Sequence, residues 1–326
     1  MPRVHRPAVV TAVAVAAGLL AAAPATGGEA TVSDPHVVAH LQFARGESPE
    51  NIALEPDGSA DLTLSNARQV LNVTRQGRTR VLATLPEVAN PHTPVVGSAV
   101  VLGIARAQDG TLFVNYATGT AATGVWRVPA HGGTPRQIAQ LPPTGFPNGL
   151  ALDERRGVLY AADSVLGTVW RVPRAGGAPT AWATGAALEP RNPRPAAKVG
   201  ANGLRFHRGA VWVSNTNAGT LLRVPVRENG SAGAIETRAT GLYALDDFDF
   251  VERHRDTALA AMTGGSEVAL VRPDGTHRVV LTPGDGLSNP TSVAVRGRTV
   301  YVTSAAYFTR KDPNLLLARV HQRARD

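Results

Sequence analysis

Four residues with oxygen-bearing side chains occupy one position of a repeated sequence phrase. The phrase is a polar residue just before a short apolar strand, followed by a turn and a second strand, and its clearest copy surrounds Asn148 in Pro-Asn-Gly-Leu-Ala-Leu-Asp. Across six copies, the marked position holds Glu50, Leu102, Asn148, Asn202, Asp246 and Thr291. The steps between them are 52, 46, 54, 44 and 45 residues. Our hypothesis is that these six side chains form a ring that carries the function.

The chemistry of such a ring would be that of a hard cation. One Glu, one Asp and two Asn make an oxygen-rich, doubly negative cluster, and two carboxylates at one axis would repel each other without a cation. Carboxylate and amide oxygens suit Ca²⁺, which accepts six to eight oxygen ligands. The absence of His and Cys from the ring argues against Zn²⁺ or copper. We therefore predict a divalent metal, Ca²⁺ before other ions, held by Glu50, Asn148, Asn202 and Asp246.

A plainer interpretation is that each ring residue only caps a strand or bonds its neighbour. Asn-Gly is a common turn dipeptide, so Asn148 and Asn202 taken singly are weak evidence for a metal. The shared register of four oxygen-bearing residues is what favours the metal site.

The elements that position the ring are four short strands per unit, at a period near 50 residues, which is typical of a β-propeller. Six units predict an all-β, six-bladed propeller with four strands per blade. The last unit lacks a fourth strand, and the lone strand at 36–43 would supply it, closing the ring and covering an open edge. Two β-sandwiches are the structural alternative, but sandwiches do not require one phrase six times.

Strand direction then assigns residues to the face that carries the ring. Successive strands alternate in direction, so the first strand of a blade starts on the face where its second strand ends. This face receives the loops after each second strand and the long connections at 86–98 and 184–199, and long loops on a rigid scaffold often carry function. The residues predicted to line a substrate site there are Leu102, His92, Tyr116, Asp163, Asn215, Thr291 and Tyr307.

The first 25 residues are interpreted as a secretory signal. Arg3 and Arg6 precede an apolar stretch at 8–23 and the sequence Ala23-Pro24-Ala25, which fits cleavage after Ala25. An uncleaved anchor is the alternative, although the apolar stretch is short for a membrane span. We expect a signal peptide at 1–25, a linker at 26–35, the propeller at 36–326, and a secreted protein with no stable membrane insertion.

Composition narrows the possible partners. The formal net charge is +8, which becomes +6 (8 − 2) without Arg3 and Arg6, and the remaining arginines are scattered. Because a nucleic-acid site needs a clustered basic face, we expect no nucleic-acid partner and predict a small-molecule substrate or ligand. With no cysteine in the chain, disulfides, thiol chemistry and Cys-ligated metals are excluded.

The chain resembles the six-bladed SMP-30/gluconolactonase-like propellers, a group that includes the paraoxonase-type lactonases. The resemblance spans Pro49 to the sixth blade and rests on Glu50, on Asn148 and Asn202 in their Asn-Gly-Leu phrases, and on Asp246. It implies that these four residues hold a catalytic divalent metal, usually Ca²⁺, and that the activity is hydrolysis of a lactone or related ester. The metal would polarise the carbonyl oxygen and acidify a bound water. Asp246 would serve as a base, with Asp247 beside it as a second candidate.

The second blade departs from the family. Paraoxonase-like members carry a His at this ring position and sugar lactonases an Asn, whereas this chain has Leu102. The nearest candidate His on the ring face is His92. The departure keeps open a second function, a non-catalytic exported propeller that binds a ligand with the metal as a structural pin. A strictosidine-synthase-like condensing enzyme shares the fold, but the intact metal quartet argues against it.

Overall fold

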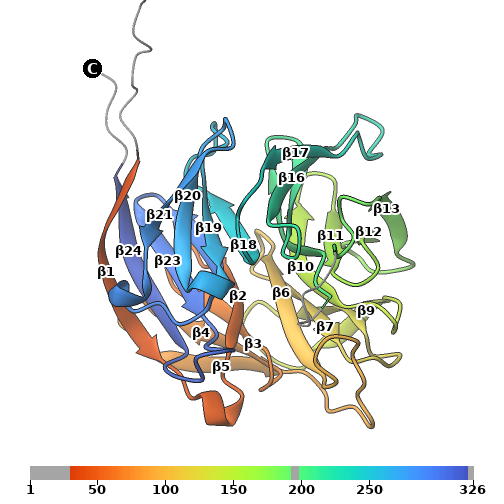
Figure 1. Cartoon of the computed structure of the whole chain (residues 1–326). Helices are drawn as coiled ribbons and strands as arrows, with labels where there is room; N and C mark the ends of the chain where they lie inside the picture. Colours follow the sequence, from red (N-terminus) through yellow and green to blue (C-terminus); the bar gives the residue numbers. More distant parts are fainter. Residues whose placement is uncertain (1–29, 192–197, 322–326) are drawn as a thin grey trace, which may run out of the picture. The chain divides into compact units, whose positions relative to one another are not determined.

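The computed structural model describes residues 30–191 and 198–321, and its strands form six separate four-stranded antiparallel sheets (Figure 1). Blade 1 contains β2 (Pro49–Leu54), β3 (Ala60–Leu64), β4 (Gln69–Val73) and β5 (Thr79–Thr84). Blade 2 contains β6 (Val100–Arg106), β7 (Leu112–Ala117), β8 (Gly124–Val128) and β9 (Arg136–Gln140). Blade 3 contains β10 (Pro147–Asp153), β11 (Val158–Asp163), β12 (Thr168–Pro173) and β13 (Thr180–Thr184).

The other three blades follow the same order. Blade 4 contains β14 (Ala201–His207), β15 (Ala210–Asn215), β16 (Thr220–Pro225) and β17 (Glu236–Ala239). Blade 5 contains β18 (Leu245–Phe250), β19 (Ala258–Met262), β20 (Glu267–Val271) and β21 (His277–Leu281). Blade 6 contains β22 (Pro290–Arg296), β23 (Thr299–Ser304), β24 (Asn314–His321) and β1 (Thr31–His40). The predicted six-bladed propeller is confirmed.

The N-terminal strand closes the sixth blade, as predicted. β1 pairs with β24 along nearly its whole length, so the first and last described strands lie side by side (Figure 1). The strand was expected at 36–43 but runs from Thr31 to His40, so it begins within the stretch expected to be linker. It extends backwards because β24 continues to His321 and offers partners as far as Thr31. The predicted signal peptide lies outside the described residues.

Apolar side chains from neighbouring blades pack face to face. Between blades 1 and 2, for example, Val70 and Leu85 meet Ile104 and Tyr116 in one buried cluster. Alternation along each strand sends successive side chains to the two faces of a sheet, so each blade contributes to two such clusters. The helical segments are three short 3₁₀ turns, at Phe43–Arg45, Thr263–Gly265 and Pro283–Asp285, and no helix of the described chain is long and apolar enough to cross a membrane.

The six inner strands, β2, β6, β10, β14, β18 and β22, form a closed circle in which each contacts the next. Each begins with a break in its register with the second strand, as between Pro147 and Leu150 or Ala201 and Leu204. Such β-bulges re-aim side chains. The bulges lie at the ring positions, so each inner strand is irregular at the residue that it contributes to the ring.

Glycine follows the ring residue in blades 2, 3 and 4 because the next inner strand passes too close for a side chain. A Cβ atom at Gly149 would lie 2.3 Å from the Asn202 carbonyl oxygen, and one at Gly103 would lie 2.2 Å from that of Asn148. The Asn-Gly pairs therefore serve blade-to-blade contact, not a tight turn.

We predict that Gly149→Ala lowers the free energy of unfolding by about 1–3 kcal/mol, because the backbone of β14 must move to admit the methyl group. Gly284→Ala is the matched control, since its Cβ would meet only Thr282 Oγ1 at 3.6 Å. Urea denaturation of both variants measures the difference. Equal stability of the two would show that the inner strands are not held at this spacing.

Candidate metal centre

The four predicted ligands lie at corresponding positions near the start of their inner strands and are almost fully buried. Exposed fractions are 6% for Glu50, 5% for Asn148, 4% for Asn202 and 8% for Asp246. Their side chains bond to residues at the ends of the second strands or in the loops that follow. The structure thus places all four on one face of the circle.

Asp246 and Asn202 are joined directly. Asn202 Nδ2 donates to Asp246 Oδ1 at 2.8 Å and also to Thr216 Oγ1 at 2.8 Å. The other Asp246 oxygen, Oδ2, lies 3.0 Å from Thr263 Oγ1 and forms a hydrogen bond with it. With both amide hydrogens of Asn202 engaged, its carbonyl Oδ1 is left buried with no hydrogen-bond partner among the described residues.

Glu50 is held from the sixth blade. The Tyr307 hydroxyl donates to Glu50 Oε2 at 2.5 Å and lies 3.0 Å from Ser65 Oγ. Tyr307, predicted to line the site, therefore reaches the ring itself. Asn148 is held within its own blade, where its Nδ2 donates to Ser164 Oγ at 3.3 Å.

Hydroxyl residues that sequence reasoning did not assign to the site orient the ring. Ser164, Thr216 and Thr263 each follow a second strand, and each donates to the carbonyl of the residue before the next blade's ring residue, at 2.8, 2.8 and 2.7 Å. Each also bonds the ring residue of its own blade. The signal was present in the sequence, because Ser or Thr recurs at this position with the same period.

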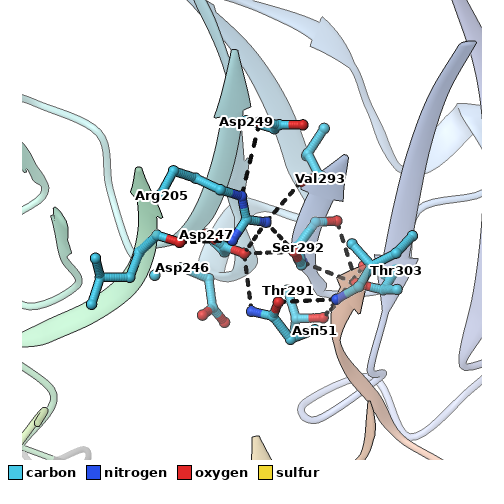
Figure 2. Close-up of polar contacts among 12 residues, drawn as sticks. Asn51, Arg205, Asp246, Asp247, Asp249, Thr291, Ser292, Val293 and Thr303 are labelled. Carbon is cyan, nitrogen blue, oxygen red and sulfur yellow. Dashed lines mark hydrogen bonds and ion pairs between the residues drawn. The ribbon is translucent and has the colours of Figure 1, made fainter. Parts of the chain in front are cut away.

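A second polar layer lies directly behind the ring, centred on Asp247. Its Oδ2 accepts hydrogen bonds from Asn51 Nδ2 at 3.0 Å, from Ser292 Oγ at 2.6 Å and from the Arg205 guanidinium at 2.6 Å (Figure 2). These three donors come from blades 1, 6 and 4, and Asp247 belongs to blade 5. One carboxylate oxygen therefore ties four blades together. This arrangement was not predicted.

Arg205 crosses the centre of this layer. Besides Asp247 it contacts Ser292 Oγ at 3.3 Å and the Val293 carbonyl at 3.2 Å, and Asp249 lies 3.9 Å from its Nε (Figure 2). Its side chain is 15% exposed and that of Asp247 only 1%. The guanidinium is a fixed internal cation beside a ring that has two carboxylates.

Burial makes the ring carboxylates hard to ionise in the absence of a bound cation. Burial first, and then the Asp247 charge, raise the pKa of Glu50 to about 7, against the stabilising hydrogen bond from Tyr307. Burial and the neighbouring Glu50 charge raise the pKa of Asp246 well above its usual value. The Asp247 charge contributes to both increases, so ionisation of Glu50 or of Asp246 is opposed by an acidic neighbour.

The residues present fit a bound cation. The observation that tests this is Asn202 Oδ1, a buried acceptor without a donor, since such atoms are costly unless something satisfies them. Within residues 30–191 and 198–321, no group of three or more His, Cys, Asp or Glu is placed to hold a metal. A site here would accordingly use two carboxylates together with amide oxygens, which is oxygen chemistry suited to Ca²⁺.

The remaining two ring positions do not offer a ligand to the axis. Leu102 is 3% exposed and packs with Val100, Ala117 and Phe146 in an apolar cluster. Thr291 Oγ1 donates to the Pro49 carbonyl at 2.8 Å and so joins blade 6 to blade 1. Leu102 makes one wall of the ring apolar, while Thr291 is a structural link.

Three other residues predicted to line the site lie elsewhere. Tyr116 is fully buried between blades 1 and 2, where its ring packs edge-on against Trp126 and its hydroxyl donates to the Pro86 carbonyl. Asp163 and Asn215 are also fully buried. The prediction was wrong for these three because alternation along the second strand turns them into the blade interior.

Asp163 and Asn215 instead organise loops. Asp163 Oδ1 accepts the backbone N–H groups of Phe146, Val165 and Leu166. Asn215 Nδ2 donates to the carbonyls of Ala187 and Glu189, which anchors the long connection after β13.

His92 lies in the connection between β5 and β6. It is exposed, its backbone N–H donates to the Thr118 carbonyl, and its Nδ1 lies 2.9 Å from the Asn90 carbonyl. None of its hydrogen bonds reaches a ring residue. The hydrogen bonds therefore give no support for a role of His92 at the ring in place of a His at position 102.

The raised pKa of Glu50 predicts how stability depends on pH without metal. Its folded-state pKa of about 7 exceeds the ordinary 4.5, so the folded protein binds more protons in this window. The free energy of unfolding should therefore fall as pH rises from 4.5 to 7 in the presence of a chelator. Urea denaturation across this range tests it. Glu50→Gln should show a flatter profile, and an unchanged slope would rule out Glu50 as the source.

The Arg205–Asp247 pair predicts a large loss of stability when it is broken. Arg205→Met should cost about 3–5 kcal/mol, because it leaves Asp247 buried without its cation. Arg208→Met is the control, since Arg208 pairs with Asp256 at an exposed site and should cost under about 1 kcal/mol. Chemical denaturation compares them. Similar losses in both variants would mean that the axial pair has no special structural role.

Comparisons with known proteins agree on the fold. No family model matches the chain, and no curated protein matches it. Among solved structures, the aldose sugar dehydrogenase of Streptomyces coelicolor, bound to PQQ, is 16% identical with a TM-score of 0.62, covering 90% of this chain and 99% of that one. The calcium-binding protein regucalcin of Agrobacterium tumefaciens is 17% identical with a TM-score of 0.60, covering 87% and 93%.

A third similar structure is the virginiamycin B lyase of Staphylococcus aureus, 12% identical with a TM-score of 0.56, covering 90% of this chain and 99% of that one. These identities are too low to transfer an activity. The chain therefore shares the β-propeller fold with proteins of several different functions.

Proposed function

We propose that this protein is a divalent-metal-dependent hydrolase of lactones or related esters, exported and dependent on Ca²⁺. The observation that carries the proposal is the oxygen set on one face of the propeller, in which Asn202 Oδ1 is buried and unpartnered beside Asp246. The fold shared with calcium-binding regucalcin is consistent with it. The signal peptide and secretion remain predictions from the sequence.

Glu50, Asn148, Asn202 and Asp246 would hold the ion. When bound, the ion would supply a Lewis acid for the substrate carbonyl and lower the pKa of water. Asn202 fixes Asp246 through one hydrogen bond and Thr263 fixes it through another, so the carboxylate enters the reaction already oriented. Such preorganisation is the main contribution that a protein makes to electrostatic catalysis.

The two acidic neighbours at 246 and 247 differ in what they can do. Asp247 Oδ2 accepts three hydrogen bonds, its Oδ1 is buried without a partner among the described residues, and its side chain is only 1% exposed, so its burial suits a positioning role. Asp246 is 8% exposed and each of its oxygens has one hydrogen-bond partner, so it is the more accessible of the two to a proton from water. We assign Asp246 as the general base and Asp247 as the residue that holds the layer behind it.

Leu102 shapes the substrate side of the ring. The apolar cluster that it forms with Val100, Ala117 and Phe146 offers no proton acceptor and excludes water from that wall. A substrate would therefore present an apolar part to blade 2 and its carbonyl to the oxygen-bearing blades.

Leu102 also favours a second candidate function. In it, the protein is a non-catalytic propeller that binds a small ligand. Leu102 leaves the second blade without a hydrogen-bonding side chain in the ring, and no hydrogen bond of His92 in the described chain reaches a ring residue. In that case the ion would only join the blades.

We expect Ca²⁺ to raise the melting temperature, and a chelator to abolish both this stabilisation and the hydrolysis of a panel of lactones and aryl esters. Asn202→Ala should weaken Ca²⁺ binding about tenfold or more by removing one ligand oxygen, measured by calorimetry. Thr291→Val, at a ring position without a ligand role, is the control for the fold. A wild-type protein that binds no divalent ion would refute the metal site. Ca²⁺ binding without hydrolysis across the panel would favour the ligand-binding propeller.

A further inference from the structure

A cavity with a mixed polar and apolar lining lies on the ring face, between the first two blades. It has a volume of about 270 Å³ and is lined by Asn66, Arg68, Glu87, Val88, Pro91, Ser98 and Ala99. These residues belong to the β3–β4 turn and to the long connection from β5 to β6. The turn starts at Ser65, which the Tyr307 hydroxyl joins to Glu50. The cavity wall therefore begins one residue away from the hydrogen bonds of the ring.

The Arg68 backbone adopts a left-handed conformation, which the same turn gives to glycine in blades 3 and 4 and to Ser266, at φ of +52°, in blade 5. Arg68 has φ of +56°, and the fourth residues of the matching turns are Gly167 and Gly219, with φ of +57° and +61°. Arg68 N–H donates to the Ser65 carbonyl as Gly219 N–H does to that of Thr216. A left-handed conformation is disfavoured for a residue with a side chain, and such strain concentrates at functional sites.

The Arg68 side chain contributes no hydrogen bond or ion pair to the fold of the described residues. Its Nε is buried without a hydrogen-bond partner, and the guanidinium forms no ion pair with any acidic residue of the described chain. Glu87 lines the same cavity but lies beyond ion-pair distance. An unpaired, partly buried cation lowers the stability of the fold, and so does a strained backbone. A bound anion would offset the cost of the unpaired charge.

We propose that this cavity binds the carboxylate of a small hydroxy acid, with Arg68 as its anchor. A guanidinium presents planar, paired donors that match a carboxylate in two hydrogen bonds. Asn66, Ser98 and Glu87 supply donors and acceptors for a hydroxyl group on the same molecule. Ring opening of a lactone yields such an acid. The identification as a product site rests on the proposed hydrolase function, whereas the carboxylate site itself does not.

Calorimetry with chelator-treated protein tests the site independently of the metal. The probes are 4-hydroxybutyrate and its uncharged analogue 4-hydroxybutyramide. Wild-type protein should bind the carboxylate about tenfold or more tightly than the amide, because charge-assisted bonds to Arg68 are lost in the amide. Arg68→Gly should lose this binding, while its melting temperature stays equal or rises because the strain is relieved.

Arg310→Gly is the matched control. Arg310 is also an arginine at positive φ, +53°, but it is exposed and does not line the cavity. This variant should retain wild-type binding. Absence of binding to the wild type, equal binding of the amide, or full binding by Arg68→Gly would each overturn the proposal.

Inorganic phosphate serves as a competitor. Displacement of the hydroxy acid by phosphate at lower concentration would show a site for a tetrahedral anion and would overturn the hydroxy-acid assignment. Because these measurements omit the metal, they do not depend on hydrolysis. Failure of the lactone panel with intact carboxylate binding would overturn the hydrolase and the identification as a product site, but not the carboxylate site. The reverse result would overturn only the carboxylate site.

Discussion

The buried carboxylates at the centre of the propeller impose the constraint on which the rest of the structure depends. Glu50 and Asp246 come from different blades and both lie where water is largely excluded, so burial and the Glu50 charge together make ionisation of Asp246 unfavourable. Protonation, a bound cation or nearby positive charge can relieve this repulsion. The structure surrounds the pair with donors and a fixed cation, which is a costly arrangement for a site that has only to hold a fold together.

The polar centre is built in two layers with separate roles. The outer layer contains the four ring side chains Glu50, Asn148, Asn202 and Asp246, of which Asn202 Oδ1 is left without a hydrogen-bond partner in the described chain. The inner layer is saturated on one Asp247 oxygen, where donors from three other blades converge. Hydrogen bonds between blades are thus concentrated behind the ring, and the apolar blade interfaces support both layers.

The fold could be predicted from the sequence because its signal is repeated six times. Period, turn residues and the missing fourth strand together indicated the blades and their closure by the N-terminal strand, with errors of a few residues at strand ends. The ring positions followed from the same register. A single short apolar segment could be assigned to a strand only weakly, whereas six copies in the same register support one assignment.

Side-chain direction at the strand ends could not be predicted in the same way. Tyr116, Asp163 and Asn215 were assigned to the ring face from topology alone, but alternation along the second strands turns their side chains into the blade interior. The Arg205–Asp247 centre was missed for a related reason, because it depends on non-repeating residues from four blades. Function is expected at residues that deviate from the repeat. The repeat itself does not show which of these residues contact one another in the folded chain.

The closing strand has a consequence for how the chain reaches its native state. Among the described strands, β1 is synthesised first and its partner β24 last. β1 therefore stays unpaired while the first five blades form. Long-range pairing of this kind slows folding and leaves edges open to other chains. Asp34, at positive φ, and Pro35 interrupt β1 at a bulge, and most of its side chains stay at least partly exposed. The strand is thereby a poor template for aggregation until its own C-terminal partner arrives.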